Sequence, residues 1–134
     1  GVNSAQAHER NRRPETRSSQ IYLKYVRYGN RISRLVADPA AGSDWMFVVA
    51  FDYEDGHYED QELDLAVAGD EQHRYVRAAE AATQPWLVRP DPFSVYRSGF
   101  EVRTYRRCRR VLMFHHFPEL GPEPCLVRAS EFDY

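Results

Sequence analysis

The chain has 134 residues, of which 43% are hydrophobic and 13% aromatic, and its formal net charge at pH 7 is −2. This length and composition suffice for one domain with an apolar core and differ from those of a disordered tail. Domains that bind phosphate backbones usually carry a basic excess, so the charge argues against nucleic acid as a partner. No apolar run approaches the ~20 residues of a membrane helix, and the polar N-terminus does not resemble a signal peptide, so we expect no direct membrane contact.

The chain begins with a polar, arginine-rich stretch and continues with segments rich in apolar residues. We interpret residues 1–19 as a linker or a frayed end, because they include almost no apolar side chains. We expect residues 20–134 to form a β-rich segment of a larger protein, since the chain starts at Gly1 and stops within a strand-like pattern.

Two strands are predicted in the first half of the chain. Residues 20–28 are rich in tyrosine and β-branched side chains, and Gly29-Asn30 predicts a turn directly after them. Residues 45–53 are apolar in both alternating sets of positions. That pattern is typical of a central strand that is covered on both faces.

The segment from Phe100 to Phe117 is the strongest strand signal in the chain. It lies between Gly99 and Pro118, contains no Gly or Pro, and mixes β-branched and aromatic residues with five arginines. A single strand of this length would span about 60 Å and would need long neighbours. A last strand should follow the turn-rich loop at 118–124. The predicted fold class is therefore mainly β, with long antiparallel strands and at most one short helix, which the alanines favour within residues 70–83.

Charge is segregated along the sequence. The stretch from Asp52 to Glu71 carries nine acidic residues and no Lys or Arg, whereas the five arginines lie between Arg103 and Arg110. These arginines could form an anion-facing or cargo-facing surface, or they could pair with the acidic stretch through bidentate contacts. We favour pairing, because charge blocks usually serve solvation and ion pairing, and we then expect substitution of Arg107 alone to change little.

No pattern in the sequence predicts a catalytic or metal site. The acidic residues from Asp52 to Asp60 supply oxygen ligands, but Gly56 is misplaced for a calcium-binding EF-hand loop. His115 and His116 are adjacent and would point to opposite faces of a strand, so the pair could not chelate a metal. Cys108 and Cys125 are interpreted as small buried hydrophobic residues, with a single disulfide as the alternative. We therefore expect no enzyme activity, metal or cofactor.

Five blocks of sequence together resemble a known family. In chain order they are Tyr28 to Arg31, Trp45 to Tyr53, Arg89 to Arg106, Val111 to Phe117, and Leu126 to Arg128. This arrangement is similar to the B component of bacterial Tc insecticidal toxin complexes and to the related virulence-plasmid SpvB proteins, in their middle, N-terminal-side region. The resemblance covers residues 21–134 and is specific for family membership rather than for an activity. Residues 54–86 depart from the family pattern, so we assign them no family role.

The resemblance implies a structural function. In such complexes the B component and the N-terminal part of the C component build a hollow shell of long β-strands of the RHS type, which encloses a toxic C-terminal cargo. The implied partners are the rest of the B component, the C component with its cargo and, through the parent protein, the A component channel. The resemblance also implies a protein that is made in the bacterial cytoplasm and acts outside the cell as part of the complex.

The residues expected to matter are structural ones, at turns, in the core or in the wall of the shell. They are Tyr28, Gly29, Asn30, Trp45, Phe51, Phe93, Gly99, Phe100, Arg103, Tyr105, Arg110, Val111 and Phe114.

Two other classes of function remain as alternatives. The chain could be an autonomous β-rich module that binds a protein or a carbohydrate, with Trp45, Trp86 and the tyrosines as contact residues, although aromatic residues at such spacings are more often core. A hydrolase that uses Asp52 or Glu54 is the remaining alternative.

Overall fold

The computed structural model describes residues 7, 9, 10, 20–33, 35, 45–61, 75–97 and 99–134. Within this part of the chain the protein is mainly β, and every strand pairing is antiparallel, which confirms the predicted fold class. The strands are β1 (Tyr25–Asn30), β2 (Trp45–Asp52), β3 (Tyr58–Gln61), β4 (Tyr75–Ala78), β5 (Phe93–Arg97), β6 (Phe100–Thr104), β7 (Arg110–His115) and β8 (Cys125–Glu131). The short 3-10 helix η2 (Pro118–Leu120) lies between β7 and β8.

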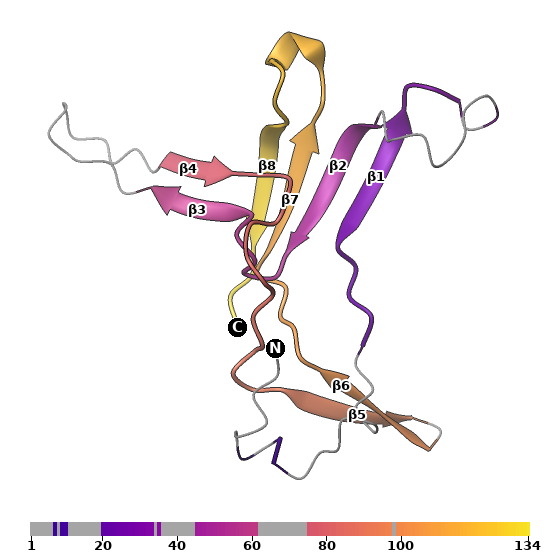
Figure 1. Ribbon diagram of the computed structural model, residues 1–134, viewed down its shortest axis with the longest axis vertical. Coiled ribbons are helices and arrows are strands. Elements are labelled where there is room, and N and C mark those ends of the chain that lie inside the picture. Colours follow the sequence, from indigo (N-terminus) through magenta and orange to yellow (C-terminus); the bar gives the residue numbers. More distant parts are fainter. Residues whose placement is uncertain are drawn as a thin grey trace, which may run out of the picture.

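The strands form one larger sheet and two hairpins. The four-stranded sheet has the order β1-β2-β7-β8, while β3 pairs with β4 and β5 pairs with β6. The sheet lies at one end of the elongated molecule, and the β5–β6 hairpin lies at the other (Figure 1). β2 and β7 occupy the centre of the sheet, so the prediction that residues 45–53 form a central strand is confirmed.

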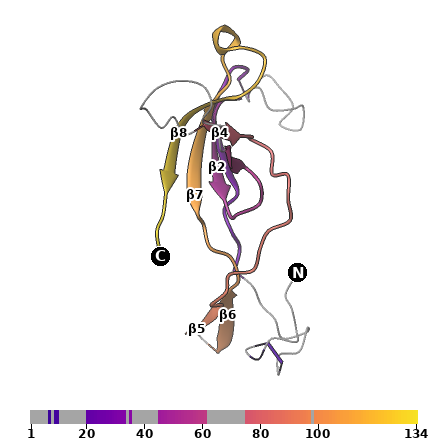
Figure 2. The ribbon, with the colours of Figure 1, turned by 90° about the vertical axis from the view of Figure 1, so that its left-hand side faces the viewer.

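The core lies on one face of the four-stranded sheet, which we call the inner face. Its buried side chains are Val48 and Ala50 of β2 and Leu112 and Phe114 of β7, which stand opposite one another in register. Tyr25, Trp45, Tyr58, Ala78 and Leu126 pack against them. The opposite, outer face carries Val49 of β2 and Val111 and Met113 of β7, all of which are half-buried. Figure 2 shows β4 and the connection to β5 on one side of the sheet only.

The prediction of one continuous strand from Phe100 to Phe117 is wrong. The segment divides into β6 and β7, which belong to different sheets, and residues 105–109 between them are irregular. The backbone N–H groups of Tyr105 and Arg106 donate to the Tyr22 hydroxyl at 2.6 and 3.3 Å, and that of Arg109 donates to the Asp52 carbonyl at 2.8 Å. These contacts replace the ladder bonds of a strand, so tertiary contacts override the local β propensity.

The helix expected within residues 70–83 is also not found in its described part. Residues 75–78 form strand β4, and residues 70–74 lie outside the described residues. The N–H of Ala79 donates to the His57 carbonyl at 2.8 Å, and that of Thr83 donates to the Asp55 carbonyl at 3.1 Å. Alanine favours a helix only weakly, and these long-range bonds prevail.

The end of β1 differs from the predicted turn at Gly29-Asn30. Gly29 has a φ of 67°, as a turn residue would, yet the strand continues to Asn30, which pairs with Trp45. A Cβ at Gly29 would lie 2.7 Å from Cδ2 of Phe47, so glycine allows both the backbone conformation and the close approach of β1 to β2.

Candidate functional site

Three buried polar residues follow one another where the chain leaves β2. Asp52, Asp55 and His57 are each at most 1% exposed. Oδ1 of Asp52 accepts a hydrogen bond from the N–H of Glu54 at 2.9 Å, and Glu54 itself adopts a positive φ of 61°. An aspartate that caps its own turn in this way lets the chain reverse direction at the end of a strand.

Two cations lie against the two buried carboxylates. The ammonium of Lys24 pairs with Asp55 and donates to the Phe51 carbonyl at 3.0 Å, while Nη1 of Arg110 donates to Oδ2 of Asp52 at 3.2 Å. We call Lys24, Asp52, Asp55, His57 and Arg110 the buried junction. Because removal of one member leaves a buried charge unpaired, such a cluster specifies a single arrangement of the segments that it joins.

The buried junction continues across the sheet into β8. Nη2 of Arg110 lies 3.0 Å from Oε1 of Glu131, and its guanidinium lies over the ring of Tyr58 at 4.4 Å. Arg110 of β7 therefore contacts residues of β2, β3 and β8.

His57 joins the junction to the segment after β4. Its Nδ1 lies 2.8 Å from the carbonyl of Ala79, whereas its Nε2 has no hydrogen-bond partner and lies 3.7 Å from Oδ1 of Asp55. No nucleophilic hydroxyl or thiol bonds to this histidine in the described part of the chain. Among the described residues, His57 is therefore not the base of a hydrogen-bonded nucleophile and base pair.

An aromatic cluster lies beside the junction, where the sheet meets the β5–β6 end of the molecule. The rings of Tyr53 and Trp86 stack with centroids 5.1 Å apart, and Tyr22 contacts both edge-on at 5.8 and 6.2 Å. The Tyr53 hydroxyl donates to the Leu23 carbonyl at 2.8 Å, and burial raises the pKa of Tyr53 to about 12. Trp86 is half-buried and packs on Tyr53 and Tyr22 within the molecule.

The arginines between Arg103 and Arg110 divide among several acidic partners. Arg107 approaches Glu54 at 3.9 Å, and Arg110 pairs with Asp52, as the sequence predicted for the acidic stretch. Arg109 instead pairs with Glu131 at 3.3 Å, and Arg106 donates to the carbonyls of the segment that contains Trp86. Within the described residues, Arg107 and Arg110 thus show the pairing with the acidic stretch that the sequence predicted.

Arg103 has a partner that the sequence did not suggest. Its Nε donates to Oε1 of Glu9 at 2.8 Å, and the Tyr105 hydroxyl donates to Oε2 of the same carboxylate at 3.0 Å. Glu9 is 1% exposed, although it lies in the stretch interpreted as a linker. Its burial could not have been read from the local sequence, because the partners are far away along the chain.

The remaining predicted residues fall into three regions. Tyr28, Gly29, Asn30 and Trp45 lie where β1 pairs with β2, with Tyr28 stacked on Phe47 at 4.9 Å. Phe51 and Val111 stand opposite each other on the outer face, and Phe114 is fully buried in the core. Phe93, Gly99 and Phe100 belong to the β5–β6 hairpin, where the two phenylalanines are 46% and 56% exposed. The residues that the sequence analysis missed are Glu9, Tyr22, Lys24 and His57.

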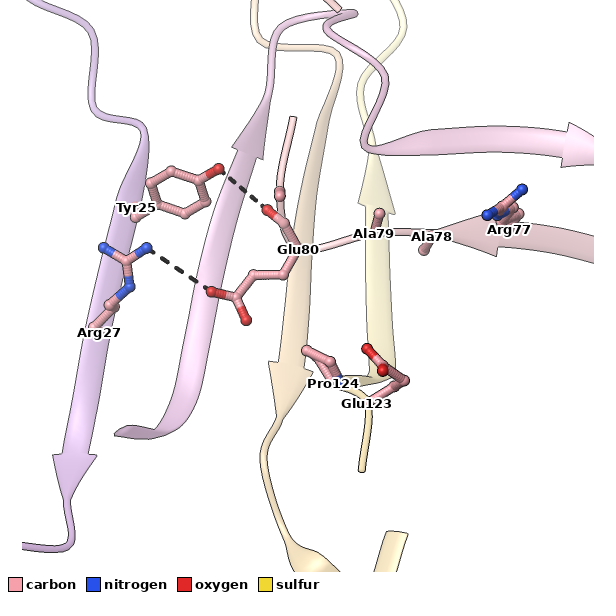
Figure 3. A pocket seen from close by; sticks show the side chains of 9 residues that line it. Tyr25, Arg27, Arg77, Ala78, Ala79, Glu80, Glu123 and Pro124 are labelled. Atoms are coloured by element: carbon pink, nitrogen blue, oxygen red, sulfur yellow. Dashed lines mark hydrogen bonds and ion pairs between the residues drawn. The ribbon is translucent and has the colours of Figure 1, made fainter. Parts of the chain in front are cut away.

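A pocket of about 560 Å³ opens between β1 and the segment that follows β4 (Figure 3). The Tyr25 hydroxyl donates to the Glu80 carbonyl at 3.1 Å, and Arg27 lies 3.8 Å from the Glu80 carboxylate, which also contacts Nε2 of His116 at 2.6 Å. Arg77 points away from this group in Figure 3. The polar side chains thus pair with one another and do not converge on a common ligand position.

Neither a metal site nor a disulfide is found in the described residues. No group of three or more His, Cys, Asp or Glu side chains there could hold a metal ion. Cys108 and Cys125 are free and half-buried, and burial raises the pKa of the Cys108 thiol. The described residues also contain no helix that is long and apolar enough to cross a membrane.

The antiparallel sheets, joined by buried ion pairs and stacked aromatic rings, define a mainly β protein. The family model described as Salmonella virulence plasmid 65kDa B protein, SpvB, matches residues 1–117, and the chain belongs to this family. The mono(ADP-ribosyl)transferase SpvB of Salmonella typhimurium is 39% identical over 129 residues, which cover 88% of this chain and 18% of the relative. The chain therefore spans about a fifth of the length of this relative.

Solved structures of both SpvB and Tc toxin components are similar to this chain. The N-terminal domain of the effector protein SpvB from Salmonella typhimurium matches with a TM-score of 0.62 and 32% identity, over 98% of this chain and 43% of that one. The TcdB2-TccC3 structure matches with a TM-score of 0.61 and 33% identity, over 96% of this chain and 6% of that one. The Photorhabdus luminescens Tc holotoxin pore matches with a TM-score of 0.59 and 36% identity, over 86% and 5% of the respective chains. The resemblance to SpvB and to Tc toxin components is confirmed.

Proposed function

We propose that this chain is a non-catalytic structural segment of a toxin-complex B component, and that it forms part of the RHS-type β wall that encloses a toxic C-terminal cargo. The observation that carries the proposal is that the buried polar groups of the chain form ion pairs between strands and segments. Asp52 at the end of β2 and Asp55 just after it are both buried, and each pairs with a cation from another strand or segment. Groups that join strands in this way serve the wall rather than a reaction.

The open edges of the four-stranded sheet support the same proposal. β1 and β8 are the edges of the four-stranded sheet, and neither outer edge pairs with another strand within the described residues. Unpaired edges normally invite the addition of further strands. A segment of a larger wall needs such edges, whereas an independent module would usually protect them.

The proposal includes partners and a location. The rest of the B component would continue the sheet, and the C component with its cargo would lie beyond it. The A component channel would be reached through the parent protein, and the complex would act outside the bacterial cell. Similarity to structures that contain TcdB2 and TccC3 supports these partners. Nucleic acid and direct membrane contact are not part of the proposal.

The absence of catalysis is proposed on two grounds. The solved SpvB match is described as an N-terminal domain, and the chain spans 18% of the relative that is named a mono(ADP-ribosyl)transferase. The transferase activity of that relative can therefore belong to the part of it that this chain does not match. The buried junction also offers no nucleophile next to a base.

Substitution of one wall residue tests the proposal. Val111→Asp places a carboxylate in the centre of the sheet, next to Phe51, and should prevent the assembled shell from protecting its cargo against protease. Leu120→Asp is the control, because Leu120 is 50% exposed in η2 and should tolerate the charge. A Val111→Asp shell that assembles and protects its cargo as well as the control would contradict the assignment of this segment to the wall.

A further inference from the structure

The outer face of the four-stranded sheet is apolar across three neighbouring strands. Val26 and Tyr28 of β1 stand opposite Val49 and Phe47 of β2, and Val49 stands opposite Met113 of β7. These side chains form one continuous surface, because directly paired residues on one face of a sheet touch one another.

This surface is exposed to a degree that is unusual for its composition. Val26 is 40% exposed and Tyr28 is 41% exposed, while Phe47, Val49 and Met113 are half-buried. Single exposed apolar residues are ordinary, but contiguous apolar patches mark interaction surfaces. Figure 2 shows no described strand or helix stacked against this side of the sheet.

The centre of the outer face is uncharged, whereas several cations lie on the inner-face side of the sheet. Lys24, Arg27 and Arg110 all contact acidic groups on the inner-face side, namely Asp55, Glu80 and Asp52. The paired outer-face positions on β1, β2 and β7 carry no Lys, Arg, Asp or Glu, and on the edge strand β8 the outer face carries Arg128, which stands opposite Met113. Depletion of charge at the centre of a surface is typical of a buried interface.

The length of the matched domain indicates what covers this face. Nearly the whole of this chain, 98%, matches the SpvB N-terminal domain, but it accounts for only 43% of that chain. More than half of the related domain is therefore available to pack against the matched segment. An apolar face of the same polypeptide supplies the second layer that a β-sheet of this kind requires.

We infer that the outer face docks an apolar, uncharged segment of the same polypeptide, located outside these 134 residues. This inference rests on the proposed function, because it requires the chain to be part of a longer toxin protein. The partner is intramolecular, so its effective concentration is high and no separate binding step is needed.

Two adjacent residues of β1 provide a matched test in the longer protein. Val26 lies on the outer face and Arg27 on the inner face, and both are 40% exposed in this structure. Val26→Asn should speed hydrogen exchange of β1 and β2 amides at least about tenfold relative to Arg27→Asn, because the new amide would be buried without partners. Equal exchange in the two variants would overturn the inference.

A second measurement needs no substitution. In hydroxyl-radical footprinting of the intact longer protein, Tyr28 should be oxidised at least about tenfold more slowly than the most reactive tyrosine of that protein. Fast oxidation of Tyr28 would overturn the inference, as would protection that is lost when the protein is diluted to a monomer, since a second copy would then be the partner. If Tyr28 is oxidised quickly in a shell that still protects its cargo, this inference fails while the proposed function stands.

Discussion

Glu9 provides a buried carboxylate that ties the N-terminal stretch to strand β6. It accepts hydrogen bonds from Arg103 and from Tyr105, and it is 1% exposed. Glu9→Gln removes the charge and leaves the Arg103 guanidinium buried without a counter-ion, which costs about 3 kcal/mol. We expect the amides of β5 and β6 in the longer protein to lose about 100-fold of their protection from hydrogen exchange.

The control for this substitution is Glu119→Gln, because Glu119 is exposed in η2. It should leave exchange in the hairpin unchanged. If Glu9→Gln behaves like Glu119→Gln, the buried pair does not hold the N-terminal stretch in place.

The buried hydroxyl of Tyr53 should make the stability of the folded protein depend on pH. Burial raises the pKa of Tyr53 to about 12, so the folded protein holds this proton more tightly than the unfolded chain, in which tyrosine ionises near its ordinary value of 10. The associated stability is complete below pH ~10 and is lost as the pH rises through ~12. The difference in absorbance at 295 nm between the wild-type protein and Tyr53→Phe should titrate near pH 12. A midpoint near pH 10 in the folded protein would show that the Tyr53 hydroxyl is solvated.

At the scale of elements, Gly29 determines how closely β1 approaches β2. Gly29→Ala requires a positive φ from a residue with a side chain and brings its Cβ to 2.7 Å from Phe47. We expect a loss of about 2 kcal/mol, seen as about 30-fold faster hydrogen exchange in β1 of the longer protein. Gly99→Ala is the matched control, because Gly99 has a φ of 86° with nothing within 4 Å. If the two substitutions destabilise their strands equally, the contact with Phe47 contributes nothing.

The elements also show how much of the fold the sequence predicts. β2 was predicted correctly because a run that is apolar in both alternating sets of positions is typical of a central strand. The break between β6 and β7 was missed because residues 105–109 have strand-like propensity, and only the contacts with Tyr22 and Asp52 remove them from a ladder. β4 was missed because its pairing with β3 outweighs a weak preference for helix.

The candidate site was predicted less completely than the fold. The pairing of Arg110 with Asp52 follows from the charge pattern, since an arginine block and an acidic block occur in one chain. Glu9, Lys24 and His57 were missed because a single acid, lysine or histidine carries no local signal of burial. Their partners are set by the tertiary fold alone.

At the scale of the whole molecule, the chain has the properties of a segment that is completed by its neighbours. The inner face has a small core of four fully buried apolar side chains, whereas the outer face and both edges of the sheet are open within the described residues. A sheet with so little burial on one face has little to offset the entropy of ordering its chain. This is the property expected of a wall segment and not of an autonomous binding module.

The most direct test of this account is thermal unfolding of the isolated 134-residue chain, followed by circular dichroism, with its size measured by gel filtration. We expect a broad, uncooperative transition and association between chains, because the open edges and the outer face lack their neighbours. A sharp transition from a monomer would contradict it and would identify an autonomous domain.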